Sequence, residues 1–440
     1  MCVYLGMLSH LDRADTAWML VSTALVLLMT PALGFFYGGL VRGKNALNTM
    51  MMSVSALGFV GVAWALVGYS LAFSPGHGFI GGLSRLALSG VGLEAQGSIP
   101  HVLFMAYQGT FAIITAALIS GAIVERMRFS AYVLFLGAWT LLVYSPVAHW
   151  VWGGGWMGKL GILDFAGGTV VHITAGTAAW VAALMVGPRR DYGRQAFLPH
   201  NVPMMLTGAA LLWFGWVGFN GGSALAVNGT AVQATVNTIL APFAAMAMWM
   251  ALEYWRTGRA TAVGAGTALV VGLVAITPAC GFVSPRAALA IGALTAIPCH
   301  LVILYRVRTR LDDSLDVLGA HGTGGAVGAL LTGVFTSTAW GGPAGLLEGA
   351  PMQLGLQALG VAVAAAWTAV ATWAILFVIG KVVPLRVSAR DESAGVDVGE
   401  HGEEGYTDGE GAILVLESVA PALAPTATHP IVPTPLARSA

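Results

Sequence analysis

Long apolar stretches recur along this 440-residue chain, and they constrain its fold more than any other feature. A helix needs about 20 mostly apolar residues to cross the hydrocarbon core of a bilayer. Eleven stretches meet that requirement, near residues 15–40, 48–72, 103–123, 130–148, 168–187, 202–222, 232–255, 262–278, 287–305, 315–336 and 354–380. Because they are long and do not alternate with period two, they favour helices over the strands of a membrane barrel. We therefore predict an all-α integral membrane protein with eleven transmembrane helices.

The composition excludes the soluble classes of protein. Only 9% of the residues are charged, whereas a soluble domain has roughly 25%. A nucleic-acid binder with a basic patch is not expected either. Three widely spaced cysteines, Cys2, Cys280 and Cys299, indicate neither a disulfide framework nor a CxxC metal site, and we expect no cofactor. The first residues also lack the pattern of a signal peptide.

The distribution of positive charge predicts the orientation, because cytosolic loops are enriched in Lys and Arg. Alternate loops hold fifteen basic residues, namely Arg42, Lys44, Arg126, Arg128, Arg189, Arg190, Arg194, Arg256, Arg259, Arg306, Arg308, Arg310, Lys381, Arg386 and Arg390. The other side holds four, namely Arg13, Arg85, Lys159 and Arg286. We therefore expect the N-terminus outside and the C-terminus in the cytosol, which an odd number of spans requires.

Composition also divides the chain into parts. Residues 1–14 form an extracytoplasmic N-terminus, and 15–390 hold the eleven helices. After residue 390 the chain becomes polar, so we expect 391–406 to be a cytosolic regulatory segment and 407–440 to be a largely disordered acidic, Pro/Ala-rich tail. Residues 391–440 contain nine acidic residues and one basic residue. We predict a salt-dependent attraction between this acidic end and the basic cytosolic loops.

The odd number of helices favours two five-helix halves related as inverted repeats. Such repeats usually place a solute site near the middle of the bilayer, at their interface. The fifth and tenth stretches share a weak pattern, because Asp164 lies eight residues before His172 and Asp316 lies five residues before His321.

Ionisable residues inside a membrane are costly, so Asp164, His172 and His321 are candidate functional residues. A single membrane histidine more often has a structural role, but two at comparable depths in two halves favour a shared function. Zinc requires three or four converging ligands, and only Cys280 offers another, so we expect no metal. Asp164 could cap the helix that follows it, or could raise the local affinity for a cation.

Aromatic residues gather at the predicted outer ends of the helices. An interfacial aromatic belt would explain them. However, Tyr107, Gln108 and Phe111 share one region of a helix, and Phe219 lies four residues before Ser223. Such a group could hold a small cation by cation–π contact and a hydroxyl acceptor. The residue types alone leave both explanations open.

Several segments resemble the ammonium transporter family (Amt/MEP/Rh), and its bacterial Amt branch in particular. They are FFYGGLVRGKN (35–45), YQGTFAIITAALISGAIVERMRFSAY (107–132), AHWVWGGGW (148–156), DFAGGTVVHITAG (164–176), GWVGFNGGSA (215–224), TPACGFV (277–283) and DVLGAHGTGG (316–325). The resemblance runs from about residue 15 to 406. It implies an ammonium transporter or channel rather than an enzyme, with an inverted five-helix pseudo-twofold repeat, assembled as a homotrimer in the cell (inner) membrane.

The resemblance also implies roles for individual residues. The outer ammonium site would be Phe111, Trp152 and Ser223, and the pore gate would be Phe111 and Phe219. His172 and His321 would line the pore and relay protons. Supporting residues would be Asp164, Trp216, Tyr107, Gln108 and Thr277.

Physical chemistry is consistent with those implied roles. A charge at the membrane centre costs about 2.5–3.5 kcal/mol or more. Ammonium can give up a proton and cross as neutral ammonia, and neutral imidazoles can both donate and accept the proton left behind. We therefore expect deprotonation, ammonia conduction and a separate proton relay, with net transfer of charge.

The segment AGVDVGEHGEEGY (394–406) resembles the C-terminal GLDxxxHGExAY element of the same family. The resemblance implies that this segment couples subunits of the trimer, and that a PII-type signal protein such as GlnK can block the pores. The residues that would take part are Gly395, Asp397, His401, Gly402 and Glu403. Two other functions stay open: an ammonium sensor that signals through this segment, and a membrane enzyme that uses the histidines as acid–base groups.

Overall fold

The computed structural model describes residues 11–406. Most of the predicted N-terminal segment 1–14 and the whole predicted tail 407–440 lie outside the described residues. The described chain is almost entirely helical, with two short hairpins made of β1 (Gly76–His77) with β2 (Ile80–Gly81) and β3 (Ala95–Gln96) with β4 (Ile99–Pro100).

Each of the eleven predicted stretches contains a helix. The main helices are α2 (Arg13–Leu40), α3 (Ala46–Ala63), α5 (His101–Ile119), α6 (Phe129–Trp139), α9 (Thr174–Val186), α10 (Val202–Trp216), α11 (Gly229–Thr257), α12 (Ala262–Ile276), α13 (Pro285–Arg306), α14 (Gly324–Phe335) and α15 (Pro351–Val382). Within residues 11–406, nine helical stretches are long and apolar enough to cross a membrane, and α12 is a shorter apolar helix. The predicted all-α membrane fold is confirmed.

Five π-helical turns interrupt or extend these helices, which hydropathy did not predict. They are η3 (Trp64–Gly68), η6 (Thr140–Tyr144), η7 (Gly168–Ile173), η8 (Val217–Gly221) and η9 (Leu318–Thr323). The first two join α3 to α4 (Tyr69–Phe73) and α6 to α7 (Ser145–Val151). Such turns are rare and often lie at functional sites. Here η7 and η9 carry the two candidate histidines.

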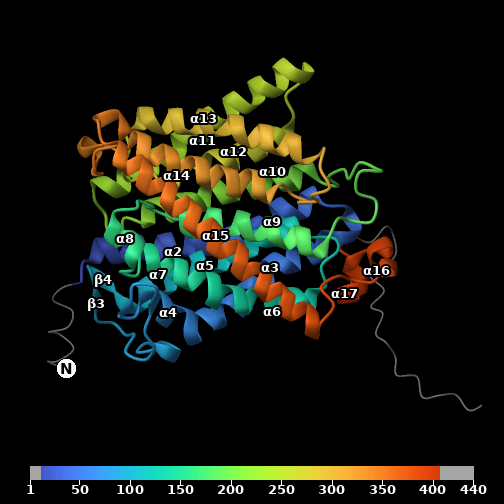
Figure 1. Ribbon diagram of the computed structural model, residues 1–440, viewed down its shortest axis with the longest axis horizontal. Coiled ribbons are helices and arrows are strands. Elements are labelled where there is room, and N and C mark those ends of the chain that lie inside the picture. The colour runs from blue at the N-terminus through green and yellow to red at the C-terminus, as the bar shows by residue number, and fades with distance from the viewer. Residues whose placement is uncertain (1–10, 407–440) are drawn as a thin grey trace, which may run out of the picture.

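The remaining elements are short and lie in the connections. They are α8 (Trp156–Leu160), η2 (Gly43–Asn45), η4 (Leu86–Leu88), η5 (Ser120–Ala122), η10 (Thr338–Trp340) and η11 (Leu346–Glu348), followed by α16 (Ala389–Ala394) and α17 (Val396–His401). Figure 1 shows the long helices running side by side, with α16 and α17 at one end. We call that end the C-terminal face. The opposite end carries Trp152 and Ser223, and we call it the aromatic face.

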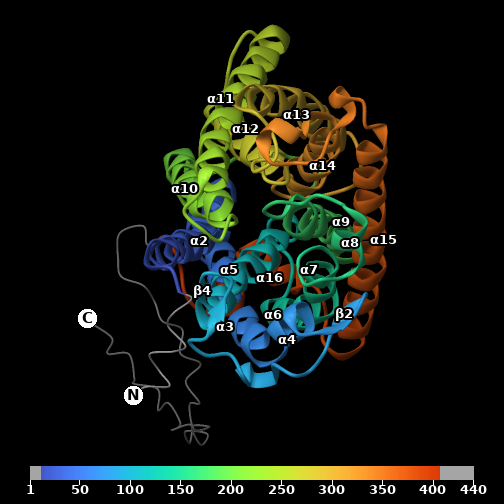
Figure 2. The same cartoon turned by 90° about the vertical axis from the view of Figure 1, so that its left-hand side faces the viewer.

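Figure 2 views the bundle from the aromatic face. Helices α10 to α14 form one group and α3 to α9 form the other, while α15 runs along the side of both (Figure 2). Helix α2 packs against α10, and α9 packs against η9. The two groups therefore meet where η7 and η9 lie.

An inverted repeat is visible in the two segments that lead to the histidines. The Asp164 carboxylate accepts hydrogen bonds from four backbone N–H groups, those of residues 167–170, at 2.6–2.9 Å. The Asp313 carboxylate accepts from the N–H groups of residues 317 and 318, at 3.0 and 2.7 Å. Each aspartate lies eight residues before its histidine. The predicted helix cap at Asp164 is confirmed.

The repeat partner of Asp164 is therefore Asp313, and the pairing with Asp316 expected from the sequence is wrong. Asp316 occupies the position of Gly167, since each lies three residues after the capping aspartate and has positive φ, +59° and +121°. The Asp316 carboxylate instead binds the Arg306 guanidinium at 2.7 Å. A left-handed residue is what both turns require, and Asp tolerates that conformation better than most residues.

Two glycines bring the halves into close contact. A Cβ on Gly176 would collide with the backbone of Gly322, and a Cβ on Gly325 would lie 2.9 Å from the Cβ of His172. Gly176 and Gly325 each lie twelve residues after a capping aspartate, so they are equivalent in the repeat. Small residues at helix interfaces let backbones approach, and here they bring His172 toward the opposite half.

Candidate functional site

The aromatic face brings together side chains that are far apart in the sequence. The Phe111 ring meets the Trp152 ring edge-on, with 6.1 Å between centroids. Trp152 Nε1 donates to the Asp164 carbonyl at 2.8 Å. Ser223 Oγ donates to the Phe219 carbonyl at 2.8 Å. Aromatic surface and a hydroxyl therefore lie together at this end of the bundle, which is a suitable combination for a small cation.

Two residues predicted to support this group have clear positions on α5. The Tyr107 hydroxyl is fully buried, lies 2.9 Å from the Phe219 carbonyl oxygen and 3.4 Å from Ser223 Oγ. Gln108 is buried beside it, and its Oε1 has no hydrogen-bond partner among the described residues. Tyr107 therefore ties α5 to η8, the turn that carries Phe219.

Phe111 and Phe219 lie directly under this group and stack on each other. Their centroids are 4.1 Å apart at an interplanar angle of 26°. Both rings are almost completely buried. The two stacked rings therefore lie between the aromatic face and the interior of the bundle.

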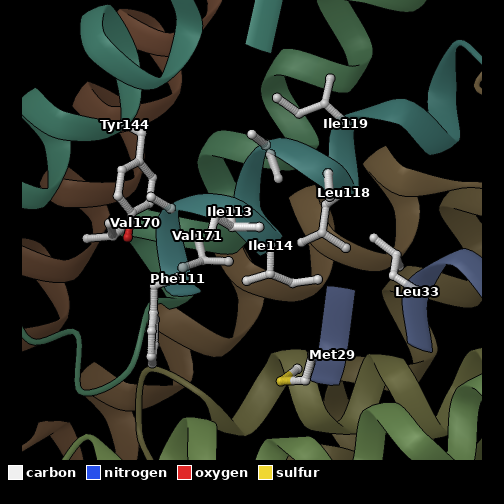
Figure 3. Close-up of a cluster of buried hydrophobic side chains, with 14 of the residues drawn as sticks. Met29, Leu33, Phe111, Ile113, Ile114, Leu118, Ile119, Tyr144, Val170 and Val171 are labelled. Atoms are coloured by element: carbon white, nitrogen blue, oxygen red, sulfur yellow. The ribbon is translucent and has the colours of Figure 1, made fainter. Parts of the chain in front are cut away.

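Below the stacked rings lies a narrow apolar cavity. Its walls are Met29, Leu33, Phe36, Ile114, Leu118, Val171, Leu212, Trp216, Phe219 and Val270, together with the two histidines. Figure 3 shows Met29, Leu33, Ile114, Leu118 and Val171 around this region, with Phe111 nearby. The cavity volume is about 10 Å³, about what one water-sized molecule requires. Ammonia is of that size.

His172 and His321 are in contact inside this cavity. Their Nδ1 atoms are 3.2 Å apart, and their ring centroids 5.3 Å apart. Both side chains are buried. In a hydrogen bond between two imidazole nitrogens one must donate and the other accept, so at least one ring carries its proton on Nδ1. His172 Nε2 has no partner among the described residues.

Trp216 fixes the plane of His172. The two rings stack with centroids 5.4 Å apart at 24°. Trp216 Nε1 donates to Thr277 Oγ1 at 2.9 Å, and Thr277 donates to the Leu273 carbonyl. The predicted supporting residues Trp216 and Thr277 therefore lie in one chain of contacts that ends at a histidine.

Beyond His321 the cavity continues into a wider vestibule that opens toward the C-terminal face. It has a volume of about 420 Å³, and the two cavities share Phe36, Val270 and His321. Polar residues line its outer part, namely Arg42, Glu125, Arg189, Tyr192, Arg306, Ser314 and Asp316. A path from the stacked rings to this face therefore passes both histidines.

A buried ion network supports the rim of the vestibule. Glu125 Oε2 binds Arg189 at 2.7 Å, Glu125 Oε1 binds Arg42 at 3.1 Å, and Asp312 binds Arg189 at 2.9 Å. Burial disfavours the Glu125 carboxylate, but Arg189 and Arg42 outweigh it and lower its pKa to about 2. Four separate segments of the chain, around residues 42, 125, 189 and 312, are therefore joined here by ion pairs.

The C-terminal segment packs against the same rim. The Asp397 carboxylate accepts from the backbone N–H groups of Leu47 and Asn48, at 3.0 and 2.7 Å, and so caps α3. Burial raises the pKa of Asp397, against those two hydrogen bonds. His401 Nε2 lies 2.9 Å from Asn48 Nδ2, and burial lowers the pKa of this imidazole.

The other predicted residues of this segment differ in what they contact. Gly395 has φ +130°, and a Cβ there would lie 2.8 Å from the Lys44 carbonyl oxygen. Gly402 ends α17 in the left-handed conformation. Glu403 is exposed at the end of the helix. Both glycines therefore have a conformational reason to be glycine.

Two acidic residues of this segment were missed from the sequence. Glu400 Oε2 accepts from the Phe129 N–H at 2.8 Å and so caps α6. Glu392 binds Arg386 at 2.8 Å and accepts from the Arg190 N–H at 2.8 Å. The start of α6 lacks intrahelical acceptors for its N–H groups, but the sequence does not show that a residue as distant as Glu400 supplies one.

Comparison with known proteins is consistent with this geometry. Residues 17–406 match the sequence profile described as the Ammonium Transporter Family. An ammonium transporter of Bacillus subtilis (strain 168) is 45% identical over 404 residues, covering 90% of this chain and 100% of the relative.

Solved structures show the same fold. The crystal structure of Saccharomyces cerevisiae Mep2 has a TM-score of 0.82 and 37% identity, and the match covers 87% of this chain and 89% of that one. A structure described as a sensor Amt protein has a TM-score of 0.83 and 30% identity, over 88% of this chain and 98% of that one. The match to the family covers nearly all of the membrane-spanning helices, and the chain belongs to the ammonium transporter family.

Proposed function

We propose that this transporter recruits ammonium at the aromatic face, removes one proton, and conducts neutral ammonia past the two histidines. The observation that carries the proposal is the contact between His172 and His321 inside an otherwise apolar cavity. An apolar cavity strongly disfavours an ion. Two hydrogen-bonded imidazoles in this cavity can transfer the proton that ammonium releases.

Recruitment would take place between the rings and the hydroxyl of the aromatic face. Phe111 and Trp152 offer π surface to a cation, and Ser223 Oγ offers a hydrogen-bond acceptor. The stacked ring of Phe219 then separates this site from the cavity, at a centroid distance of 4.1 Å from Phe111. A ring rotation would admit a small molecule and exclude a hydrated ion.

The proton would pass along the histidines in a balanced sequence. Ammonium loses a proton and becomes ammonia, while His172 gains that proton and becomes an imidazolium. His172 then gives a proton across the Nδ1–Nδ1 contact to His321, which releases one toward the vestibule. Ring reorientation restores the starting tautomers. Ammonia crosses the cavity uncharged, and one positive charge crosses in total.

Proteoliposomes test this function. An inward ammonium gradient should produce a transient positive current, and the current should scale with the amount of reconstituted protein. A potassium gradient of the same size should produce none, because potassium has no proton to release. Liposomes that show neither an ammonium current nor a pH change driven by ammonia would contradict the proposal.

We further propose that the chain lies in the cell membrane with the C-terminal face in the cytosol. The loops at that face carry the fifteen basic residues counted above. A membrane-impermeant thiol reagent applied to intact cells should label a variant with Cys2→Ser and Gln96→Cys, because Gln96 is exposed at the aromatic face and Cys280 and Cys299 are buried. Labelling only after the cells are opened would reverse the orientation.

The proposed assembly is a homotrimer with one path per subunit, regulated by a PII-type signal protein such as GlnK. The support is the family resemblance, together with a vestibule of about 420 Å³ that opens beside α16 and α17. Native mass spectrometry in detergent should give three times the chain mass. Purified PII protein should reduce the ammonium current, and a current that does not change would contradict this part.

An ammonium sensor is the second candidate function. Its support is the likeness to a structure described as a sensor Amt protein and the direct capping of α3 and α6 by the C-terminal segment. Deletion of residues 407–440 tests a sensor that signals through the tail, and it leaves the capping residues Asp397 and Glu400 in place. A variant that conducts normally and signals normally would argue against a sensor that signals through this tail.

A further inference from the structure

The stretch from the turn between β1 and β2 up to the residues just before β3 exposes more apolar surface than a water-facing loop normally does. Phe79 is 68% exposed, Leu83 61% and Leu86 37%. Residues 74–93 contain one charged side chain, Arg85. Soluble surfaces rarely keep a contiguous apolar patch of this kind without a partner. We call residues 79–93 the 79–93 segment.

Contacts with α4 fix the depth of this segment in the bundle. Ser70 Oγ donates to the Gly82 carbonyl at 2.8 Å and accepts from the Arg85 N–H at 3.0 Å. The Arg85 guanidinium donates to the Phe73 carbonyl at 2.7 Å and lies 5.8 Å from the Tyr69 ring centroid. The segment therefore lies beside the last turns of the second span and does not project beyond them.

The backbone is held firmly in this position. Leu88 packs against the hydrophobic core, while Leu86 points outward. Ala87 and Leu88 have positive φ, +48° and +61°. Side chains other than glycine rarely adopt this conformation, which costs about 1–2 kcal/mol per residue and persists only where surrounding contacts impose it. The exposure of Leu83 and Leu86 therefore follows from a fixed backbone conformation.

The exposed residues continue the apolar outer surface of the second span. Turn η4 packs against η3. On the same span, Val62 is 58% exposed and Leu66 is 50% exposed. Figure 2 shows the segment at the margin of the bundle, outside α3 and α4. Phe79 packs against Trp150 and Trp156, residues of the type that gathers at membrane interfaces.

We propose that the 79–93 segment lies in the lipid interface of the leaflet at the aromatic face. Phe79, Leu83 and Leu86 would insert at the boundary between headgroups and acyl chains, in the way that amphipathic peripheral elements do. Arg85 anchors the backbone from the protein side. This inference concerns lipid contact and is independent of the proposed transport mechanism.

Site-directed spin labelling tests the proposal without reference to transport. Full-length protein with Cys2→Ser receives Leu83→Cys or Leu86→Cys, since Cys280 and Cys299 are buried. Gln96→Cys in the same loop is the matched control, because Gln96 is exposed and polar. Each nitroxide-labelled variant is reconstituted in phosphatidylcholine liposomes, and its collision rates with oxygen and with a water-soluble nickel chelate are measured.

The expected result is a severalfold higher ratio of oxygen to nickel collisions at positions 83 and 86 than at position 96. Ratios equal to that of Gln96→Cys would place the segment in water and overturn the proposal. Labels that are immobilised and shielded from both reagents would show that protein covers the patch, which also overturns it. Two label positions protect the result against a local defect in either variant.

Discussion

His172 and His321 come from different halves of the chain, yet their Nδ1 atoms lie 3.2 Å apart. The contact requires three features at once: an aspartate that caps each segment, a π-helical turn that carries each histidine, and a glycine that lets the halves approach. Each feature occurs twice, in η7 with α9 and in η9 with α14.

Gly176→Ala should destabilise the protein and separate the histidines. A methyl group there collides with the Gly322 backbone, and overpacking typically costs about 1–3 kcal/mol. The measurement is the thermal unfolding midpoint of the detergent-solubilised protein. Gly355→Ala is the matched control, because a Cβ at Gly355 meets nothing within 4 Å. Equal midpoints for the two variants would refute the close-approach argument.

Thr277→Val should loosen Trp216 and, through it, His172. The substitution leaves the buried Trp216 N–H without its acceptor, which costs about 1–3 kcal/mol. Thr277→Ser keeps the hydroxyl and should behave close to wild type in both unfolding midpoint and ammonium current. If the Thr277→Val and Thr277→Ser variants gave the same unfolding midpoint and the same ammonium current, the hydroxyl would have no positioning role.

Glu125 should make stability dependent on pH. Its pKa is about 2 in the folded protein and near 4.5 ordinarily, so its stabilising contribution is complete above pH 4.5 and is lost as the pH falls toward 2. At about 1.4 kcal/mol per pKa unit the contribution is about 3 kcal/mol. Unfolding at pH 7, 4.5 and 3 measures it.

Glu125→Gln is the control for that pH dependence. It should weaken the protein at pH 7 by about 3 kcal/mol, because the Glu125 charge that pairs with Arg42 and Arg189 is lost, although Arg189 keeps its ion pair with Asp312. It should also flatten the loss of stability between pH 4.5 and 3. A variant that keeps the same slope would assign the pH dependence to other carboxylates.

Trp152→Leu should weaken ammonium recruitment without abolishing transport. Loss of one cation–π partner costs about 0.5–2 kcal/mol, which corresponds to a rise in KM of about 2–30-fold. Trp340→Leu, at an exposed tryptophan of the same face, should leave KM unchanged. A KM equal to wild type in the Trp152 variant would remove this residue from the recruitment site.

Hydropathy predicted the helical membrane fold well, because it depends on residue type over long windows. The local geometry around the histidines was harder to predict from the sequence. The count of residues from Asp164 to His172 pointed to a partner eight residues before His321, and Asp313 occupies that position. Asp316, five residues before His321, is instead the residue at the position of Gly167. Its left-handed backbone and its bond to Arg306 become visible only in three dimensions.

The site followed the same pattern. Family-like motifs named Phe111, Phe219 and the two histidines, and these residues do lie together. Glu392 and Glu400 were missed, since their partners are backbone N–H groups whose position depends on tertiary packing. The five π-helical turns were missed for a related reason, because one additional residue in a helical turn leaves no mark on an apolar sequence.

The proton relay is the central claim, and currents from single-histidine variants test it most directly. Wild type, His172→Ala and His321→Ala are reconstituted at equal density and compared on a solid-supported membrane, after unfolding midpoints show that each variant is folded. The account predicts that the ammonium-evoked current is lost in both variants. A wild-type current in either variant would contradict a relay that runs through both imidazoles.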